Sequence, residues 1–263
     1  MSETPIIYNT IGHGYRGSRA ADPRIVEQLL AAMNAPPGAV ICDVGAGSGN
    51  YANAMAARGY SVLAVEPSVV MRVQADPHER VSWYDGVAER LPLPDAAAQA
   101  GMCVLAVHHF RSLAATAHEL DRVCGNGAFV FFTFDPHGAQ SLWLNDYFPE
   151  IGAEAEKLFP PMDDFVAAVQ AETGRSGEVT GFPLPSDLKD GFLQAPWNRP
   201  ETYLDAGFRA NSSGFAKADP AHVARGLARH ESDLKSGAWD RRNGGLRAQA
   251  SFDAGYRFVV FRR

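Results

Sequence analysis

The feature that most constrains the fold is the stretch ICDVGAGSGNY at residues 41–51, where an apolar run ends in an acid and three glycines follow at every second position. The apolar run is typical of a buried strand, and the segment SGNYANAMAAR after it indicates a helix. Glycines between them allow positive φ and let a ligand lie against bare backbone. The stretch therefore predicts a strand, a ligand-binding turn and a helix whose first amides are unpaired.

The same alternation of apolar strands and helices continues along the chain. Strands are expected near residues 39–44, 61–66, 81–86, 101–107 and 127–134, with helices near 48–58, 67–75 and 112–123 between them. Apolar strands joined by helical crossovers are parallel, so the pattern predicts an α/β, Rossmann-like, doubly wound sheet. A sixth strand at 178–184 and an amphipathic final strand at 254–263 are expected to complete it.

The length and organisation fit one domain of 263 residues with three parts. We expect an N-terminal cap at 1–37, a cofactor-binding core at 38–135, and a substrate-side cover with the last strands at 136–263. The segments SLWLNDYF and MDDFVAAVQAE are predicted helices, and the Pro-, Gly- and Trp-rich region after residue 185 is expected to give irregular or helical cover.

Bulk properties exclude several partners. The net charge of −6 argues against nucleic acid, which normally requires a basic face. The apolar stretches are too short to span a bilayer, and Cys42, Cys103 and Cys124 have no metal-ligand spacing. We therefore expect a cytoplasmic protein with no metal and no membrane partner; the sequence leaves open whether it forms a homo-oligomer.

The spacing of the glycines distinguishes between nucleoside cofactors. A dinucleotide fingerprint G-x-G-x-x-G would place its third glycine at position 50, which is Asn50. Asp43 precedes the turn, where a carboxylate would repel a pyrophosphate and attract an ammonium group. Glu66 ends the second strand, 19 residues after Gly47, where a carboxylate can accept both ribose hydroxyls. These features favour S-adenosylmethionine over NAD, and an NAD-dependent oxidoreductase is the weaker alternative.

Five motifs in register resemble the class I S-adenosylmethionine-dependent methyltransferases of the type 11 methyltransferase-domain group. They are DVGAGSG (43–49), VLAVEPS (62–68), DGVAERLPLPDAA (85–97), VLAVHHF (104–110) and ELDRVCGNGAFVFFT (119–133). The resemblance covers residues 40–134 and implies a seven-stranded sheet whose last strand is antiparallel.

The resemblance also implies cofactor contacts by position. The methionine part should be framed by Asp43, Gly45, Gly47 and Gly49, the ribose held by Glu66, the adenine edge met by Val87 and Ala88, and the amino-acid moiety met by the backbone at Ala106. Many relatives carry an acid at position 87, where this chain has valine. Arg19 is expected at the cofactor carboxylate, and Tyr15 at the sulfonium, where it would bind and also assist transfer.

Candidate acceptor-side residues follow the fourth and fifth strands. His108 is the candidate general base, because imidazole titrates near neutrality and lies at the sheet rim where ligands bind; a purely structural role stays open. His109, Asp135, Trp143, Tyr147 and Trp197 are expected to surround a small organic substrate. The predicted activity is O-, N- or C-methylation of a small molecule. The alternatives are C-methylation of an alkene or prenyl-type metabolite and a non-catalytic S-adenosylmethionine-binding module.

Overall fold

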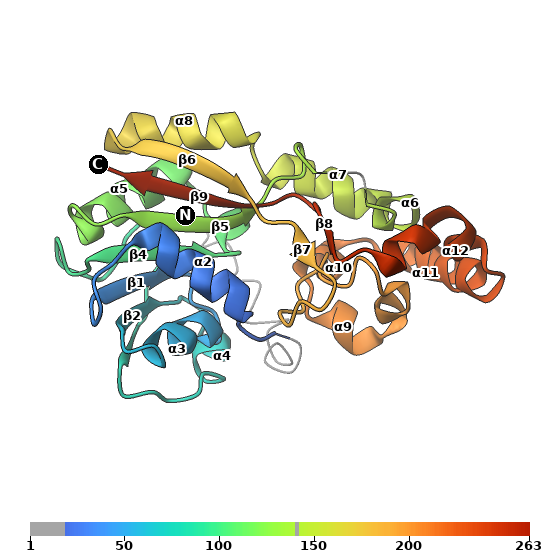
Figure 1. Ribbon diagram of the computed structural model, residues 1–263, viewed down its shortest axis with the longest axis horizontal. Helices are drawn as coiled ribbons and strands as arrows, with labels where there is room; N and C mark the ends of the chain where they lie inside the picture. The colour runs from blue at the N-terminus through green and yellow to red at the C-terminus, as the bar shows by residue number, and fades with distance from the viewer. Residues whose placement is uncertain (1–18, 140–141) are drawn as a thin grey trace.

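The computed structural model describes residues 19–139 and 142–263, and its centre is a seven-stranded sheet in the order β3-β2-β1-β4-β5-β9-β6 (Figure 1). The strands are β1 (Val40–Val44), β2 (Ser61–Val65), β3 (Val81–Tyr84), β4 (Ala100–Val104), β5 (Phe129–Phe134), β6 (Ser176–Gly181) and β9 (Tyr256–Arg262). Strands β1 to β5 pair in parallel, and β9 runs antiparallel between β5 and β6. The predicted sheet, with its last strand antiparallel, is confirmed.

Helices cover both faces of this sheet, as a parallel sheet requires. One face packs against α2 (Pro23–Met33) and α3 (Asn50–Ala56), and the other against α5 (Leu113–Cys124) and α8 (Met162–Thr173). Asp22 begins α2 as its N-cap, accepting the Arg24 amide at 2.9 Å, and Pro23 follows in the first turn. The short helix α4 (Val69–Arg72) follows β2.

Residues beyond β5 build a cover at the end of the sheet where the parallel strands finish (Figure 1). It contains α6 (Leu144–Tyr147), α7 (Pro149–Leu158), α9 (Ala206–Ala210), α10 (Ser213–Lys217), α11 (Pro220–Lys235), α12 (Ala238–Asn243) and the small pair β7 (Leu184–Pro185) with β8 (Ser251–Phe252). Helix α7, which the sequence did not predict, begins at Pro149 immediately after α6. No helix within residues 19–139 and 142–263 is long and apolar enough to cross a membrane.

The cover has an aromatic core of its own. Trp143 stacks on the His230 ring at 5.2 Å and meets Trp239 edge-on at 5.2 Å. The Trp143 indole donates to the Trp197 carbonyl at 2.7 Å, and Trp197 and Trp239 are fully buried. This cluster is continuous with the sheet's apolar layer on the α2 side, so the cover packs as an extension of the sheet's own core.

Candidate functional site

The candidate cofactor site is built around the glycine turn that joins β1 to α3. Gly45, Gly47 and Gly49 have φ of 73°, 58° and 80°, the left-handed region that only glycine adopts without strain. A Cβ on Gly45 would lie 2.6 Å from the Ala106 Cβ, and one on Gly49 would lie 2.7 Å from the Trp83 ring. The backbone of the turn is therefore not covered by side chains of its own, and at Gly45 it packs closely against the segment after β4.

Two buried carboxylates flank this turn. The Asp43 side chain is 1% exposed, and its Oδ2 atom has no hydrogen-bond partner among the described residues. Burial, with a contribution from the Glu66 charge, raises the pKa of Asp43 to about 8. Glu66 accepts the amides of Gly47 at 3.0 Å and Ser68 at 2.8 Å, and burial raises its pKa as well. A cation and hydroxyl donors would stabilise this buried pair.

The end of β4 faces the turn and is strained. Leu105, the residue after the strand, has φ of 56°, which is uncommon for a branched side chain and is often found at ligand sites. Its amide donates to the Phe132 carbonyl at 2.8 Å, and Ala106 is buried at the start of a 3-10 turn over Val107–His109. At the predicted adenine edge, Ala88 is buried and Val87 is 39% exposed.

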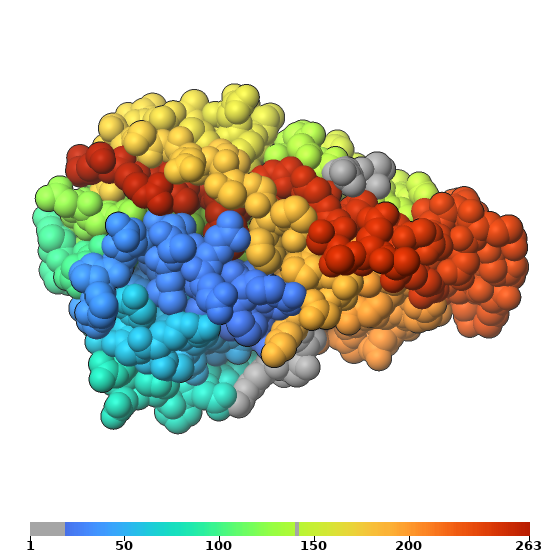
Figure 2. Space-filling model, in the orientation of Figure 1, coloured from blue at the N-terminus to red at the C-terminus, as the bar shows by residue number. Residues whose placement is uncertain are grey.

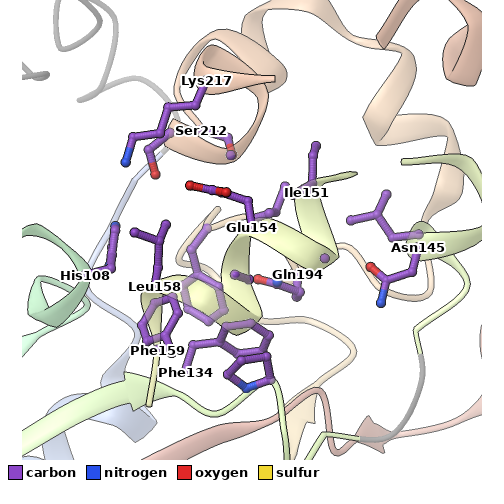
Figure 3. A pocket seen from close by; sticks show the side chains of 18 of the residues that line it. His108, Phe134, Asn145, Ile151, Glu154, Leu158, Phe159, Gln194, Ser212 and Lys217 are labelled. Carbon is purple, nitrogen blue, oxygen red and sulfur yellow. The ribbon is translucent and has the colours of Figure 1, made fainter. Parts of the chain in front are cut away.

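A cavity of about 590 Å³ opens between this edge of the sheet and the cover (Figure 3). Its apolar wall combines the end of β5, the end of α7 and the segment after β7. The side chains most involved are Leu105, His108, Phe134, Leu158, Phe159, Phe192, Gln194 and Tyr256, and the charged and polar lining includes Arg19, Asn145, Glu150, Glu154, Glu156, Ser212, Lys217, Asp219 and His222.

His108 stands at the junction of the sheet and the cavity. Its ring lies 5.3 Å from the Phe159 ring and 3.9 Å from His109. Desolvation, followed by the charges of His109, Lys217 and Arg19, holds the pKa of His108 well below its usual value. The imidazole is therefore neutral near pH 7 and is a weaker base than a free imidazole. His109 is exposed and does not line the cavity.

The other predicted acceptor residues that the structure describes are not among those that line the cavity. Trp143, Tyr147 and Trp197 are buried in the core of the cover. Asp135 is also buried: it accepts the amides of His137 at 3.1 Å and Gly138 at 3.0 Å, and so closes the turn after β5. Tyr15 lies outside the described residues.

Several lining residues were not predicted from the sequence. Phe134 carried a usable signal, because it is the last residue of a strand that ends at the ligand-binding edge. No such signal exists for Phe159, Glu154, Gln194 and Lys217, because each belongs to the cover, where no local pattern indicates which side chains line a cavity.

Comparisons with known proteins agree with this geometry. Residues 42–132 match the family described as "Methyltransferase domain". A putative methyltransferase from an antibiotic biosynthesis pathway of Anabaena variabilis is 42% identical, with 94% of this chain and 99% of that one covered and a TM-score of 0.91. The ubiquinone/menaquinone biosynthesis C-methyltransferase UbiE of Rubrivivax gelatinosus is 28% identical over 173 residues, which are 56% of this chain and 68% of that protein.

A more distant structure shares the fold. Geranyl diphosphate C-methyltransferase from Streptomyces coelicolor is 15% identical, with 91% of this chain and 75% of that one covered and a TM-score of 0.55. The fold, the matched segment and the 42% identical structure define the class: the chain belongs to the class I S-adenosylmethionine-dependent methyltransferases.

The residues present fit the cofactor of this class. The unpartnered Asp43 Oδ2 suits an ammonium group, which would lower the pKa that burial has raised. The space that a Cβ at Gly45 would fill allows close backbone approach at the same point. Asp43, Gly45, Gly47, Glu66 and Ala106 lie together, as the motifs predicted; their contacts with the cofactor stay predictions.

Proposed function

We propose that the cavity beside the glycine turn holds the methyl acceptor, a small molecule with an apolar and largely planar body. The observation that carries this proposal is the aromatic wall. The Phe134 ring meets the Phe159 ring edge-on, with centres 5.5 Å apart, and is tilted against the Tyr256 ring at 5.3 Å. The Phe192 ring centre lies 4.5 Å from that of Tyr256. Flat aromatic faces in a cavity of this size bind a planar apolar body well.

The chain's own residues bind, align and desolvate the reactants. S-adenosylmethionine, when bound, supplies a methyl group that leaves the sulfonium by in-line displacement. Asp43 and Glu66 would hold the cofactor's polar ends at the turn, next to the strained backbone at Leu105, and the cover would exclude water. Neutral His108 would accept the proton that a phenolic or similarly acidic nucleophile loses, since such a nucleophile needs only a weak base.

C-methylation is the second candidate, because the same aromatic faces could stabilise a developing carbocation. The relative named as a C-methyltransferase is consistent with it. A diphosphate-bearing acceptor is disfavoured. The cavity lining includes the four acids Glu150, Glu154, Glu156 and Asp219 against the two cations Arg19 and Lys217, and the His222 ring is bound to Glu150.

The test is release of S-adenosylhomocysteine from S-adenosylmethionine with a panel of phenols, quinols, amines, carboxylic acids and prenyl alcohols. Turnover should be found among acceptors with a planar apolar body, and Phe159→Ala should raise KM more than it lowers kcat, because it removes wall area. Turnover confined to compact polar acceptors would refute the assignment of the aromatic wall. Tight cofactor binding without turnover on any acceptor would favour the non-catalytic alternative.

A further inference from the structure

A buried carboxylate joins three parts of the chain at the edge of the cavity. Asp190, 1% exposed, lies in the segment Asp187–Gln194 that follows β7. Its carboxylate accepts hydrogen bonds from Nε and Nη2 of Arg19, the latter at 3.1 Å, and from the Tyr51 hydroxyl at 2.9 Å. Three donor atoms, two of them from one guanidinium, compensate the desolvation of this charge.

Two of the connected residues belong to the cofactor side. Asn50 and Tyr51 open α3 directly after the glycine turn. The Asn50 Nδ2 atom donates to the Arg19 carbonyl at 3.2 Å, and the Tyr51 phenol reaches the same carboxylate as the Arg19 guanidinium. The first turn of α3 therefore holds both the backbone and, through Asp190, the side chain of Arg19.

The third part is the cover. The Asp187–Gln194 segment lies against the start of α2, where Figure 2 shows its orange atoms touching the blue N-terminal part. Asp22 accepts the Lys189 amide at 2.9 Å, and Arg24 bonds Asp187 at 2.6 Å. The same segment supplies Phe192 and Gln194 to the cavity wall, and the Arg19 guanidinium lies 5.9 Å from the Phe192 ring centre.

From this geometry we infer that Asp190 and Tyr51 are positioning residues: they fix the Nε–Nη2 edge of Arg19 and thereby hold its guanidinium at the edge of the acceptor cavity. The inference rests on the proposed function and on the expectation from the sequence that Arg19 meets the cofactor carboxylate. Because Asp190 belongs to the segment that builds the cavity wall, cofactor binding and docking of that segment should stabilise each other. Such coupling is reciprocal and typically changes affinity about 5- to 150-fold.

A double-mutant cycle read by calorimetry with S-adenosylhomocysteine tests the inference. Asp190→Asn and Arg19→Gln should each weaken binding by about 10-fold or more, within that coupling range. In the Arg19→Gln background, Asp190→Asn should change the Kd no further, because Asp190 acts through Arg19. Tyr51→Phe, which removes one hydrogen bond and keeps the ring, should weaken binding by a smaller factor.

The control is Glu201→Gln. Glu201 also accepts two N–H groups from one arginine, Arg247, but it lies on the exposed surface of the cover. The Kd of the Glu201→Gln variant for S-adenosylhomocysteine should equal that of the wild-type protein.

Three outcomes would overturn the inference: unchanged Kd in a folded Asp190→Asn protein, unchanged Kd in Arg19→Gln, or equal losses for Asp190→Asn with and without Arg19. If Asp190→Asn fails to fold, Tyr51→Phe decides the matter, and an unchanged Kd in that variant overturns the inference. Failure of the wild-type protein to bind S-adenosylhomocysteine would instead remove the proposed function, and the inference with it.

Discussion

The close approach of the glycine turn to the end of β4 makes a quantitative prediction about Gly45→Ala. Two penalties act there. The backbone holds φ of 73°, and strain of a non-glycine residue in this region costs about 1–3 kcal/mol. The new Cβ would also lie 2.6 Å from the Ala106 Cβ, and overpacking of this kind costs about 1–3 kcal/mol. We therefore expect the free energy of unfolding to fall by about 2–6 kcal/mol, the sum of the two.

Gly59 provides a matched control, because it has positive φ of 91° and nothing within 4 Å of an added Cβ. Gly59→Ala should show the backbone penalty alone, about 1–3 kcal/mol. The difference between the two variants measures the steric contact with Ala106. Adding Ala106→Gly to Gly45→Ala should recover that steric share, so the double variant should be more stable than the sum of the single losses predicts.

Urea unfolding of the four variants without cofactor, and calorimetry with S-adenosylhomocysteine, provide the measurements. Gly45→Ala should also weaken cofactor binding, whereas Gly59→Ala should leave it unchanged. Equal destabilisation by Gly45→Ala and Gly59→Ala, together with no recovery by Ala106→Gly, would refute the contact between the turn and β4.

Three further predictions concern charge. The pKa of Asp43 is raised to about 8 in the folded protein, so the stability that its protonated form contributes is complete below about pH 4 and is lost as the pH rises through 8. Between pH 5 and 7, the free energy of unfolding of the cofactor-free protein should fall by about 1.4 kcal/mol per pH unit relative to that of Asp43→Asn. Urea titrations at several pH values measure this slope. Glu66→Ala should weaken S-adenosylhomocysteine binding by at least about 1.5 kcal/mol by calorimetry, and unchanged affinity in a folded variant would contradict ribose binding. Because the pKa of His108 is lowered, kcat/KM should not decline between pH 7 and 6, and a decline centred on 6.5 that disappears in His108→Gln would contradict a neutral imidazole.

The cofactor side could be predicted from the sequence because its constraints are local. The acid, the glycines and Glu66 occur at fixed distances from strand ends, and parallel pairing brings those ends together, with Asp43 opposite Ala64 and Met102. The acceptor side depends on packing between distant segments. Trp143 and Trp197 were expected at the cavity because large aromatics suit a ligand, yet the same rings serve the core of the cover equally well. Nothing in the local sequence distinguishes these two uses.

Asp190 shows how the two sides depend on each other. By sequence it is an isolated acid in a Pro- and Gly-rich segment, 139 residues from Tyr51 and 171 from Arg19. In the fold, that acid is the point at which the first turn of α3 meets the segment that builds the cavity wall. Loop segments are usually the least stable parts of a fold, so a buried ion pair placed here links the wall's order to the occupancy of the glycine turn. Such a link would make acceptor binding tighter once the cofactor is in place, an order of binding that single-turnover kinetics with preloaded cofactor can test directly. Equal rates from either order of addition would contradict it.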